Sequence, residues 1–505
     1  MKRILSAVLL AVTLFAAAPL PKPKLVVAIV IDQFRYDYLT RFRSEYAAGF
    51  DRLLTQGAVF TDADLQHFPT VTAIGHSTFL SGALPSISGI IGNDWYDRDE
   101  GRKVTSVSDS KTQLLGGVPA EGSSPRRMVV DTIGDELKMA DAGKSHVIGV
   151  SLKDRAAILP SGHMADGAFW FDPKSGNFVS STYYFTQLPG WVKDFDASHP
   201  ADRYRGATWL TRKLPESGPK LYSAIDASPF GNEMVEALAE RAMEAEQLGK
   251  HDATDVLTVS FSSNDYVGHQ LGPDSPEVHE MAVRADRVLA KLFAAVDRQV
   301  GLDNALIVLT ADHGVAPVPE VNAARRMPGG RMPLSLVTKT AQTALAARYG
   351  EGNWIVSGGE DSLYLNLALE AQKKLDPAQV NRTAADAIRA LPHIFRVYTR
   401  EDLIHGEALP DPITRRVENG YYARRGADIE MLLDPYWIFS AAGTTHGTAF
   451  DYDTHVPVIF MGRGIKPGRY YESITPNDIA PTLAAILDVE TPAGSVGRVL
   501  SEIIQ

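Results

Sequence analysis

Four near-continuous runs of Val, Ile and Leu constrain the fold most strongly, because charged or imidazole side chains follow each of them. Such runs indicate strands that are buried on both faces, as in a parallel sheet covered by helices. Amphipathic helical patterns lie between them, for example at 231–249 and 276–300. The runs are KLVVAIVID, ending at Asp32; SHVIGVSLKDR, leading into Lys153 and Arg155; DVLTVSFSSNDYVGH, leading into Asp265 and His269; and ALIVLTADHG, leading into Asp312 and His313. We therefore predict an α/β fold with a central, mostly parallel sheet, helices on both faces, and a ligand site at the carboxyl ends of its strands.

Two longer stretches interrupt this pattern. Residues from about 160 to 225 are rich in aromatic residues, Gly, Pro and Ser, which predicts an irregular insertion beside the site. Residues 318–438 show a second alternation of helices and strands, which predicts a smaller inserted α/β cap lobe. The run VPVIFMG at 456–462 then returns to the main sheet. The predicted main domain therefore comprises residues 23–317 and 439–505.

The N-terminus has the layout of a secretory signal peptide, with Lys2 and Arg3 before a short apolar stretch and three alanines. We expect cleavage after Ala18, so that residues 1–18 are removed and the mature protein is periplasmic or secreted. The alternative is an uncleaved anchor, but the apolar stretch is short for a membrane-spanning helix. Loss of Lys2 and Arg3 takes the formal net charge from −11 to −13. This acidity argues against nucleic acid as the principal partner.

Thr72 stands before a Gly-containing, apolar segment, and Asn93 lies 21 residues later. This context predicts a helix N-terminus, where unpaired backbone N–H groups and the helix dipole favour an anion. Thr72 is therefore placed like a nucleophile that attacks a phosphoryl group. Threonine is a poor nucleophile without help, so the rest of the chain must bind a metal ion that activates Thr72.

Candidate metal ligands follow the strands. Asp265 and His269 share one face if a helical turn follows their strand. Asp312 and His313 are adjacent and can splay around a second ion. Candidate ligands also include Asp32 at the first strand end and His446 in the segment AGTTHGTAF. Carboxylate and imidazole ligands in a chain without cysteine suit catalytic zinc better than manganese or another divalent ion.

His455 is the alternative to His446 as the last ligand. We favour His446 because Gly447, directly after it, allows close backbone approach. Each ligand alone also has an ordinary structural explanation. Asp32 can be a strand-end cap, His269 and His446 loop histidines, and the ADHG segment a turn that uses a positive φ at Gly314. The joint order of these residues after separate strands favours a site.

The expected charges match a dianionic ester. Two divalent cations, three carboxylates and the Thr72 alkoxide leave a neutral site, and the cationic residues Lys153 and Arg155 make it positive. A phosphate monoester is therefore attracted locally despite the acidic surface. Two extra cationic donors also bind a dianionic monoester more strongly than a monoanionic diester.

The motifs resemble the alkaline phosphatase superfamily, and specifically its threonine-nucleophile phosphatase branch, which is related to the nucleotide pyrophosphatase/phosphodiesterases. The match covers most of the chain and rests on the segments IVIDQFRYDYL, PTVTAIGHSTFLSG, GIIGNDWYD, SLKDRAAILPSGH, SNDYVGHQLGP, LTADHG and GTTHGT in that order. The resemblance implies a zinc-dependent alkaline phosphatase that hydrolyses phosphate monoesters and releases inorganic phosphate.

The resemblance also implies a role for each site residue. Two Zn²⁺ ions per chain are expected, with no magnesium at a third site because Lys153 and Arg155 take that place. Asn93, Lys153 and Arg155 would bind the phosphoryl oxygens, and a covalent phosphothreonine would form at Thr72. The zinc that activates Thr72 would be held by Asp32, Asp312 and His313, and the zinc that binds the leaving group by Asp265, His269 and His446.

Several rival functions remain to be weighed. A phosphodiesterase of the same fold would need an apolar pocket for the second ester group, which the aromatic segment from Phe169 to Tyr184 could supply. A sulfatase would need a C/S-x-P-x-R motif, which the sequence lacks. A metal-dependent binding protein would show no turnover, and a phosphomutase fits poorly with an exported chain. We expect a monomer with no stable membrane span after signal cleavage.

Overall fold

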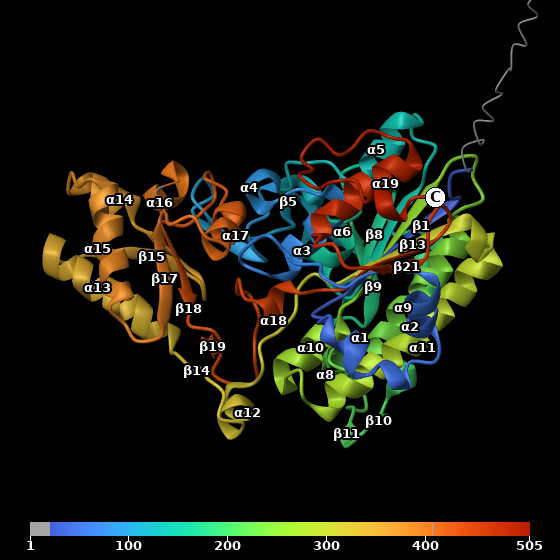
Figure 1. Ribbon diagram of the computed structural model, residues 1–505, viewed down its shortest axis with the longest axis horizontal. Coiled ribbons are helices and arrows are strands. Elements are labelled where there is room, and N and C mark those ends of the chain that lie inside the picture. Colours follow the sequence, from blue (N-terminus) through green and yellow to red (C-terminus); the bar gives the residue numbers. More distant parts are fainter. Residues whose placement is uncertain (1–20, 407) are drawn as a thin grey trace, which may run out of the picture.

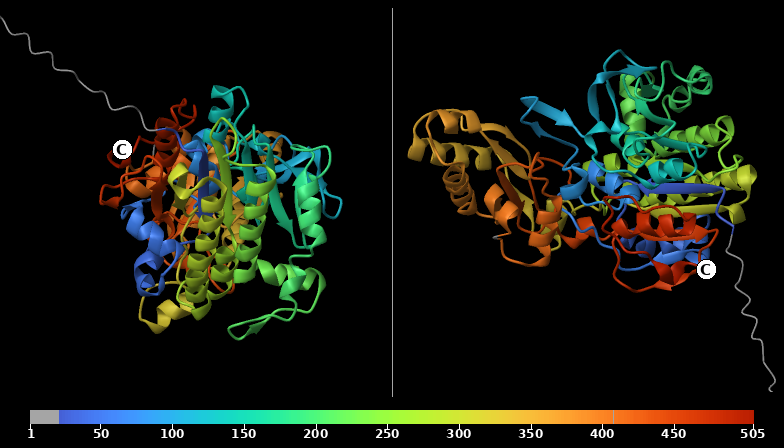
Figure 2. Two further views of the ribbon diagram at one scale, coloured as in Figure 1. Left: turned by 90° about the vertical axis from the view of Figure 1, so that its right-hand side faces the viewer. Right: turned by 90° about the horizontal axis from the view of Figure 1, so that it is seen from above.

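The computed structural model describes residues 21–406 and 408–505. The predicted signal peptide, residues 1–18, lies outside the described residues. The chain forms a main α/β domain and a cap lobe that extends from one side of it, as Figure 1 and the view from above in Figure 2 show. Among the described residues, no helix combines the length and apolar character needed to span a bilayer.

The main domain is built on one large mixed sheet. Its central strands, from β13 through β1, β12 and β7 to β8, are all parallel, whereas antiparallel pairings dominate toward both edges. The order is β21 (Gly468–Tyr470), β2 (Ala58–Phe60), β20 (Val458–Gly462), β13 (Ala305–Thr310), β1 (Leu25–Ile31), β12 (Asp255–Phe261), β7 (Val147–Ser151), β8 (Gly167–Asp172), β9 (Asn177–Ser181), β5 (Ser108–Leu115) and β6 (Glu121–Ser123).

Helices cover both faces of this sheet, as predicted (Figures 1 and 2). Strand β1 shows why its run is apolar throughout. Leu25, Val27 and Ile29 enter one core, Val26 and Ala28 enter the other, and every residue of the strand is buried. The helices are α2 (Gly49–Gln56), α9 (Pro229–Ala245) and α11 (Pro276–Val300) on the first face, and α3 (Thr72–Ser81), α5 (Ile133–Ala140) and α19 (Ile479–Leu487) on the second.

Part of the predicted irregular insertion is regular structure. The run from Gly167 to Ser181 forms β8 and β9, and β8 pairs in parallel with β7. Aromatic residues are frequent here because β8 is buried on both sides, with Phe169 in one core and Trp170 in another. The remainder adds α7 (Gly190–Ala197), α8 (Gly218–Asp226) and a short hairpin, β10 (Thr208–Trp209) with β11 (Arg212–Lys213).

The cap lobe has its own sheet and its own core. Its antiparallel strands run in the order β15 (Ile355–Gly358), β16 (Ser362–Leu365), β18 (Ile429–Leu433) and β17 (Ile394–Thr399). Helices α13 (Leu334–Tyr349) and α15 (Pro377–Arg389) pack on one face of this sheet through a separate apolar cluster. Helix α17 (Pro412–Gly420) instead faces the main domain, where it contacts α4 (Pro85–Ser88).

Candidate active site

The predicted site residues converge at the carboxyl edge of the central strands. Strands β7, β12, β1 and β13 are neighbours in the sheet, so the residues that follow them meet at one edge. Asp32 follows β1, Asp312 follows β13, and Lys153 follows β7 at the start of α6 (Asp154–Ile158). Asp265 lies on α10 (Ser263–Leu271), directly after β12.

Asp32, Asp312 and His313 form the first candidate metal-binding cluster, with their ligand atoms within 4.8 Å of one another. His313 Nε2 lies 3.5 Å from Asp32 Oδ1 and 3.4 Å from Asp312 Oδ2. All three atoms are buried and have no hydrogen-bond partner. Burial and the nearby Asp312 raise the pKa of Asp32. Three converging, unpaired buried acceptors fit a divalent cation.

Asp265, His269 and His446 form the second cluster. The predicted helical spacing is confirmed, because α10 places His269 Nε2 3.2 Å from Asp265 Oδ1. His446 Nε2 approaches the same oxygen at 3.5 Å. The rings of His446 and His313 stack with centroids 3.5 Å apart, so the two clusters are in direct contact.

Backbone carbonyls orient all three histidines. The Nδ1–H of His313 donates to Gly314 O at 2.9 Å, that of His269 to Thr444 O at 3.0 Å, and that of His446 to Thr70 O at 2.7 Å. Each ring therefore presents Nε2 to its cluster. Such second contacts fix the tautomer and the orientation that a metal ligand needs.

His455 lies outside both clusters. Its Nε2 donates to Thr61 O at 3.0 Å, and its ring stacks on Tyr36. The structure therefore brings His446, and not His455, to the site. The expectation that Gly447 allows close backbone approach is wrong, because a Cβ there would only reach ordinary contact with Val71. A glycine is needed at this position because its φ is +109°.

The turn at Gly314 does not use a positive φ, in contrast to the alternative explanation of the ADHG segment. A Cβ at Gly314 would lie 2.2 Å from Tyr452 O. The close approach of the 452–453 backbone thus explains the glycine after His313.

Lys153 lies between the two clusters. Its Nζ donates to Asp32 Oδ2 and Asp265 Oδ2 at 2.6 Å each, and to Thr72 Oγ1 at 3.4 Å. Burial alone would lower the pKa of Lys153, but Asp265 and Asp32 outweigh it and raise the pKa. The pKa of Asp265 is in turn held well below its ordinary value, because Lys153 and His269 outweigh the effect of burial. Lys153 is therefore a fixed positive charge beside Thr72.

Thr72 is the first residue of α3 and is almost completely buried. Helix α3 packs directly on the first cluster at Gly75, where a Cβ would lie 2.4 Å from Asp312 O. The Ala73 N–H donates to Asn93 Oδ1 at 2.9 Å, so the Nδ2 donors of Asn93 stay available beside Thr72. The predicted nucleophile thus stands at a helix N-terminus with an amide donor next to it.

Arg155, on α6 two residues after Lys153, lies close enough to Lys153 to affect its pKa. Its Nε is buried without a hydrogen-bond partner, and its nearest carboxylate, Asp154, lies 3.8 Å from Nη1. A guanidinium held in this way has donors free for an anion such as a phosphoryl group.

Two residues that support the site were not predicted from the sequence. Gln33 joins both clusters, since its backbone N donates to Asp312 Oδ1 at 3.0 Å and its Nε2 to Asp265 Oδ1 at 2.8 Å. His76 Nδ1 lies 2.9 Å from Thr72 O and 3.4 Å from Asp312 Oδ2. The only signals for them were position: Gln33 directly follows Asp32, and His76 lies one helical turn after Thr72.

Known proteins match this chain over nearly its whole length. The family model for type I phosphodiesterase/nucleotide pyrophosphatase matches residues 26–454. The alkaline phosphatase PafA of Elizabethkingia meningoseptica is 38% identical, over 96% of this chain and 95% of its own length. The alkaline phosphatase PhoV of Synechococcus elongatus is 37% identical, over 96% of this chain and 93% of its own.

A solved structure agrees with these sequence matches. The crystal structure of wild-type PafA superimposes with a TM-score of 0.90 at 36% identity, over 97% of this chain and all of that one. The chain therefore belongs to the type I phosphodiesterase/nucleotide pyrophosphatase family of the alkaline phosphatase superfamily, in the branch formed by the PafA-like alkaline phosphatases.

Proposed function

We propose that this alkaline phosphatase hydrolyses phosphate monoesters through a covalent phosphothreonine at Thr72, with one zinc ion held in each ligand cluster. One observation carries the proposal: Thr72 Oγ1 lies at the N-terminus of α3, 3.4 Å from the Lys153 ammonium, which itself contacts one carboxylate of each cluster. A hydroxyl in this position is prepared for attack on an anionic phosphorus centre.

The donor set supports zinc as the metal. Each cluster offers carboxylate and imidazole donors, and the chain contains no cysteine. Asp32, Asp312 and His313 would hold the ion nearer Thr72, and Asp265, His269 and His446 the other. Two such ions would lower the pKa of the attacking hydroxyl and of water, and would stabilise the departing oxygen. No third-site magnesium is proposed, since Lys153 Nζ already contacts Asp32 and Asp265.

The chain's own residues bind and orient the ester. Asn93 Nδ2, Lys153 Nζ and the Arg155 guanidinium donate to the phosphoryl oxygens that take no part in bond exchange. Thr72 Oγ gives up its proton and forms a bond to phosphorus, while the bond from phosphorus to the alcohol oxygen breaks and that oxygen takes up a proton. Water then gives up a proton and bonds to phosphorus, the bond to Thr72 Oγ breaks, Thr72 regains its proton, and inorganic phosphate departs. Lys153 stabilises the Thr72 oxygen in both steps, because it donates to that oxygen directly.

Monoester preference follows from the number of cationic donors. A monoester presents two negative charges on its terminal oxygens; Lys153 contacts Thr72, and Arg155 lies close enough to Lys153 to affect its pKa, so both positive charges are near that position. A diester carries one charge less and must place a second ester group against these donors. Phosphodiester hydrolysis is the alternative function, since the matching family model is named for phosphodiesterases.

Two further predictions from the sequence belong to this proposal. The N-terminal sequence favours export to the periplasm or medium, with residues 1–18 removed, and a monomeric enzyme. Residues 318–438 are proposed as a cap lobe inserted between the two parts of the catalytic domain, 23–317 and 439–505.

The ratio of monoester to diester turnover tests the proposed function. We expect kcat/KM for nitrophenyl phosphate to exceed that for bis-nitrophenyl phosphate by orders of magnitude at controlled zinc. Lys153→Ala/Arg155→Ala should lower the monoester kcat/KM by about a hundredfold or more, and the diester value much less. Lys374→Ala/Arg382→Ala, at exposed positions of the cap lobe, removes the same charge and should change neither value. A wild-type preference for the diester would overturn the assignment.

A further inference from the structure

A cavity of about 440 Å³ lies beside the site, between the main domain and the cap lobe; we call it the interlobe cavity. The segment from Phe169 to Tyr184, which could have supplied an apolar pocket for a second ester group, does not line it. Phe169 and Phe178 are buried in the core of the main domain. The walls come instead from the loop before Thr72, the hairpin β3 (Asp94–Asp97)–β4 (Arg102–Thr105), and the cap strands β15, β16 and β18.

The interlobe cavity opens onto one side of the catalytic centre. Asn93, His269 and His446 line it, whereas Asp32, Asp312 and His313 do not. The histidines that line it belong to the cluster proposed to hold the leaving-group ion. An alcohol that departs from phosphorus on the side away from Thr72 would therefore leave toward this cavity.

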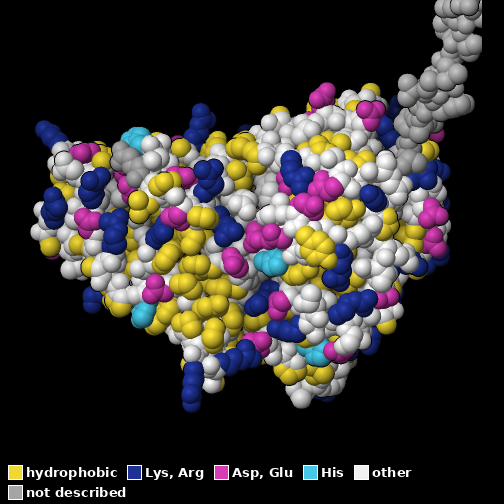
Figure 3. Space-filling model, in the orientation of Figure 1, with side chains coloured by type: hydrophobic (Ala, Val, Ile, Leu, Met, Phe, Trp, Pro, Cys, Tyr) yellow, Lys and Arg dark blue, Asp and Glu magenta, His cyan; other side chains and the backbone are white. Residues whose placement is uncertain are grey.

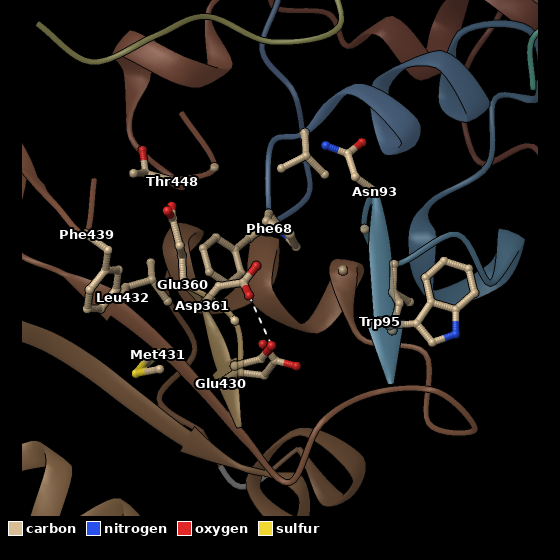
Figure 4. Close-up of a pocket in the computed structure, with 18 of the residues that line it drawn as sticks. Phe68, Asn93, Trp95, Glu360, Asp361, Glu430, Met431, Leu432, Phe439 and Thr448 are labelled. Atoms are coloured by element: carbon tan, nitrogen blue, oxygen red, sulfur yellow. Dashed lines mark hydrogen bonds between the residues drawn. The ribbon is translucent and has the colours of Figure 1, made fainter. Parts of the chain in front are cut away.

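Two features of the wall define the ligand chemistry. One is apolar: Phe68, Leu432 and Phe439 face the cavity, as Figure 4 shows. On the face drawn in Figure 3, hydrophobic side chains gather between the two lobes beside acidic ones. A cavity with these side chains removes the body of an aryl or alkyl alcohol from water.

The other feature is negative charge. Glu360, Asp361 and Glu430 reach the cavity from the cap sheet (Figure 4). The lysine in the wall, Lys103, is paired with Asp94 at 2.8 Å. Among the described residues, none of the three cap carboxylates has a Lys or Arg nitrogen within 4.0 Å in an ion pair. Burial raises the pKa of Glu360 and Asp361, and burial with the neighbouring Asp361 raises the pKa of Glu430 well above its ordinary value. The ionisation of this wall, and with it the repulsion of an anionic alcohol, therefore increases as the pH rises.

We propose that the interlobe cavity is the leaving-group subsite, and that it selects monoesters whose alcohol has an apolar or aromatic body and carries no negative charge. The proposal rests on the proposed function. Alcohols with a further phosphate or carboxylate group are rejected by the cap carboxylates. Neutral and cationic alcohols are accepted on the apolar wall. The cap lobe thus sets the substrate class, while the main domain supplies the chemistry.

The test compares four monoesters. Three are phenyl phosphates with a meta methyl, aminomethyl or carboxylate group, and the fourth, methyl phosphate, is too small to reach the cavity. We measure kcat/KM for each aryl ester relative to methyl phosphate, in the wild type and in Asp361→Asn/Glu430→Gln. Because intrinsic reactivity cancels between the two enzymes, the change in each ratio reports the cavity alone. If the wild type did not hydrolyse methyl phosphate, the proposed function itself would be wrong.

At alkaline pH, where the cap carboxylates are most fully ionised, we expect the carboxylate ester to gain on the order of tenfold in Asp361→Asn/Glu430→Gln, as the loss of negative charge several ångströms away predicts at an effective dielectric of about 20. The aminomethyl ester should lose a comparable factor, and the methyl ester should change little. Phe439→Ala should lower all three aryl ratios. Glu351→Gln and Tyr471→Ala, both exposed and outside the cavity, are the matched controls.

Unchanged ratios in both cavity variants would overturn the proposal. A change confined to bis-nitrophenyl phosphate would also overturn it, and would assign the cavity to the second ester group of a diester.

Discussion

At the scale of single residues, the site depends on side chains that touch no substrate. Gln33 is the main example, since it donates to one carboxylate of each cluster and thereby holds the clusters in a common geometry. Its side chain requires Gly268, where a Cβ would lie 1.8 Å from Gln33 Oε1. Gln33 also adopts a positive φ of 58°, which turns the chain sharply after Asp32.

We predict that Gln33→Ala weakens zinc binding by about 10- to 100-fold, because Asp265 loses the donor that orients it. Zinc titration of the chelated enzyme, followed by recovery of activity, measures this directly. At saturating zinc, kcat should return close to the wild-type value. Gln372→Ala, exposed on the cap lobe, should bind zinc normally. Normal zinc affinity in Gln33→Ala would contradict the supporting role.

At the scale of secondary-structure elements, α17 of the cap lobe holds the loop that leads to Thr72, the proposed nucleophile. The Phe68 N–H donates to Arg416 O at 2.9 Å, and Asn419 Nδ2 donates to Gln66 O at 2.6 Å. The helix end fits so closely that a Cβ on Gly420 would lie 1.6 Å from Phe68 O. The start of α3 is therefore positioned partly from the cap lobe.

We predict that Gly420→Ala lowers kcat by up to about a hundredfold, because the loop before Thr72 must move and a shift of about 1 Å at a reacting group has that effect. Asn419→Ala removes one hydrogen bond and should show a smaller loss without unfolding. Zinc content should stay normal in both, which separates positioning from metal loss.

Arg415→Ala, an exposed residue on the same helix, is the control and should retain kcat. Wild-type kcat in a folded Gly420→Ala enzyme would show that α17 does not position Thr72.

The strand-end residues could be predicted from the sequence, because apolar runs locate buried parallel strands and parallel strands share one carboxyl edge. The spacing of Asp265 and His269 likewise follows from helical geometry. Gln33 could not be predicted, since nothing in its local pattern shows that its side chain spans two clusters. The carboxylate of Glu430 reaches the interlobe cavity only through the docking of two lobes, and periodicity carries no information about that contact.

At the scale of the whole molecule, the two clusters join parts of the chain that are far apart in sequence. Asp32, Asp265 and Asp312 follow different strands, and His446 comes from beyond the cap lobe. Three buried carboxylates at one edge repel one another unless cations neutralise them. Metal binding should therefore stabilise the fold as well as the site.

We predict that chelation lowers the melting temperature and abolishes activity, and that zinc restores both. At a free zinc concentration of 100 times Kd, each site should add about 2.7 kcal/mol to the free energy of unfolding. Calorimetry with and without chelator measures the shift. Asp265→Asn should show a reduced response to zinc. An unchanged melting temperature after complete metal removal would contradict this coupling.

The central claim is that Thr72 forms a covalent bond to phosphorus, and trapping that species tests it most directly. The enzyme is mixed with a phosphate monoester, quenched in acid within one turnover, digested and examined by mass spectrometry. The account predicts one added phosphoryl group on the peptide containing Thr72, absent from a folded Thr72→Ala enzyme that also lacks turnover. A phosphoryl group on another residue, or robust turnover by Thr72→Ala, would contradict it.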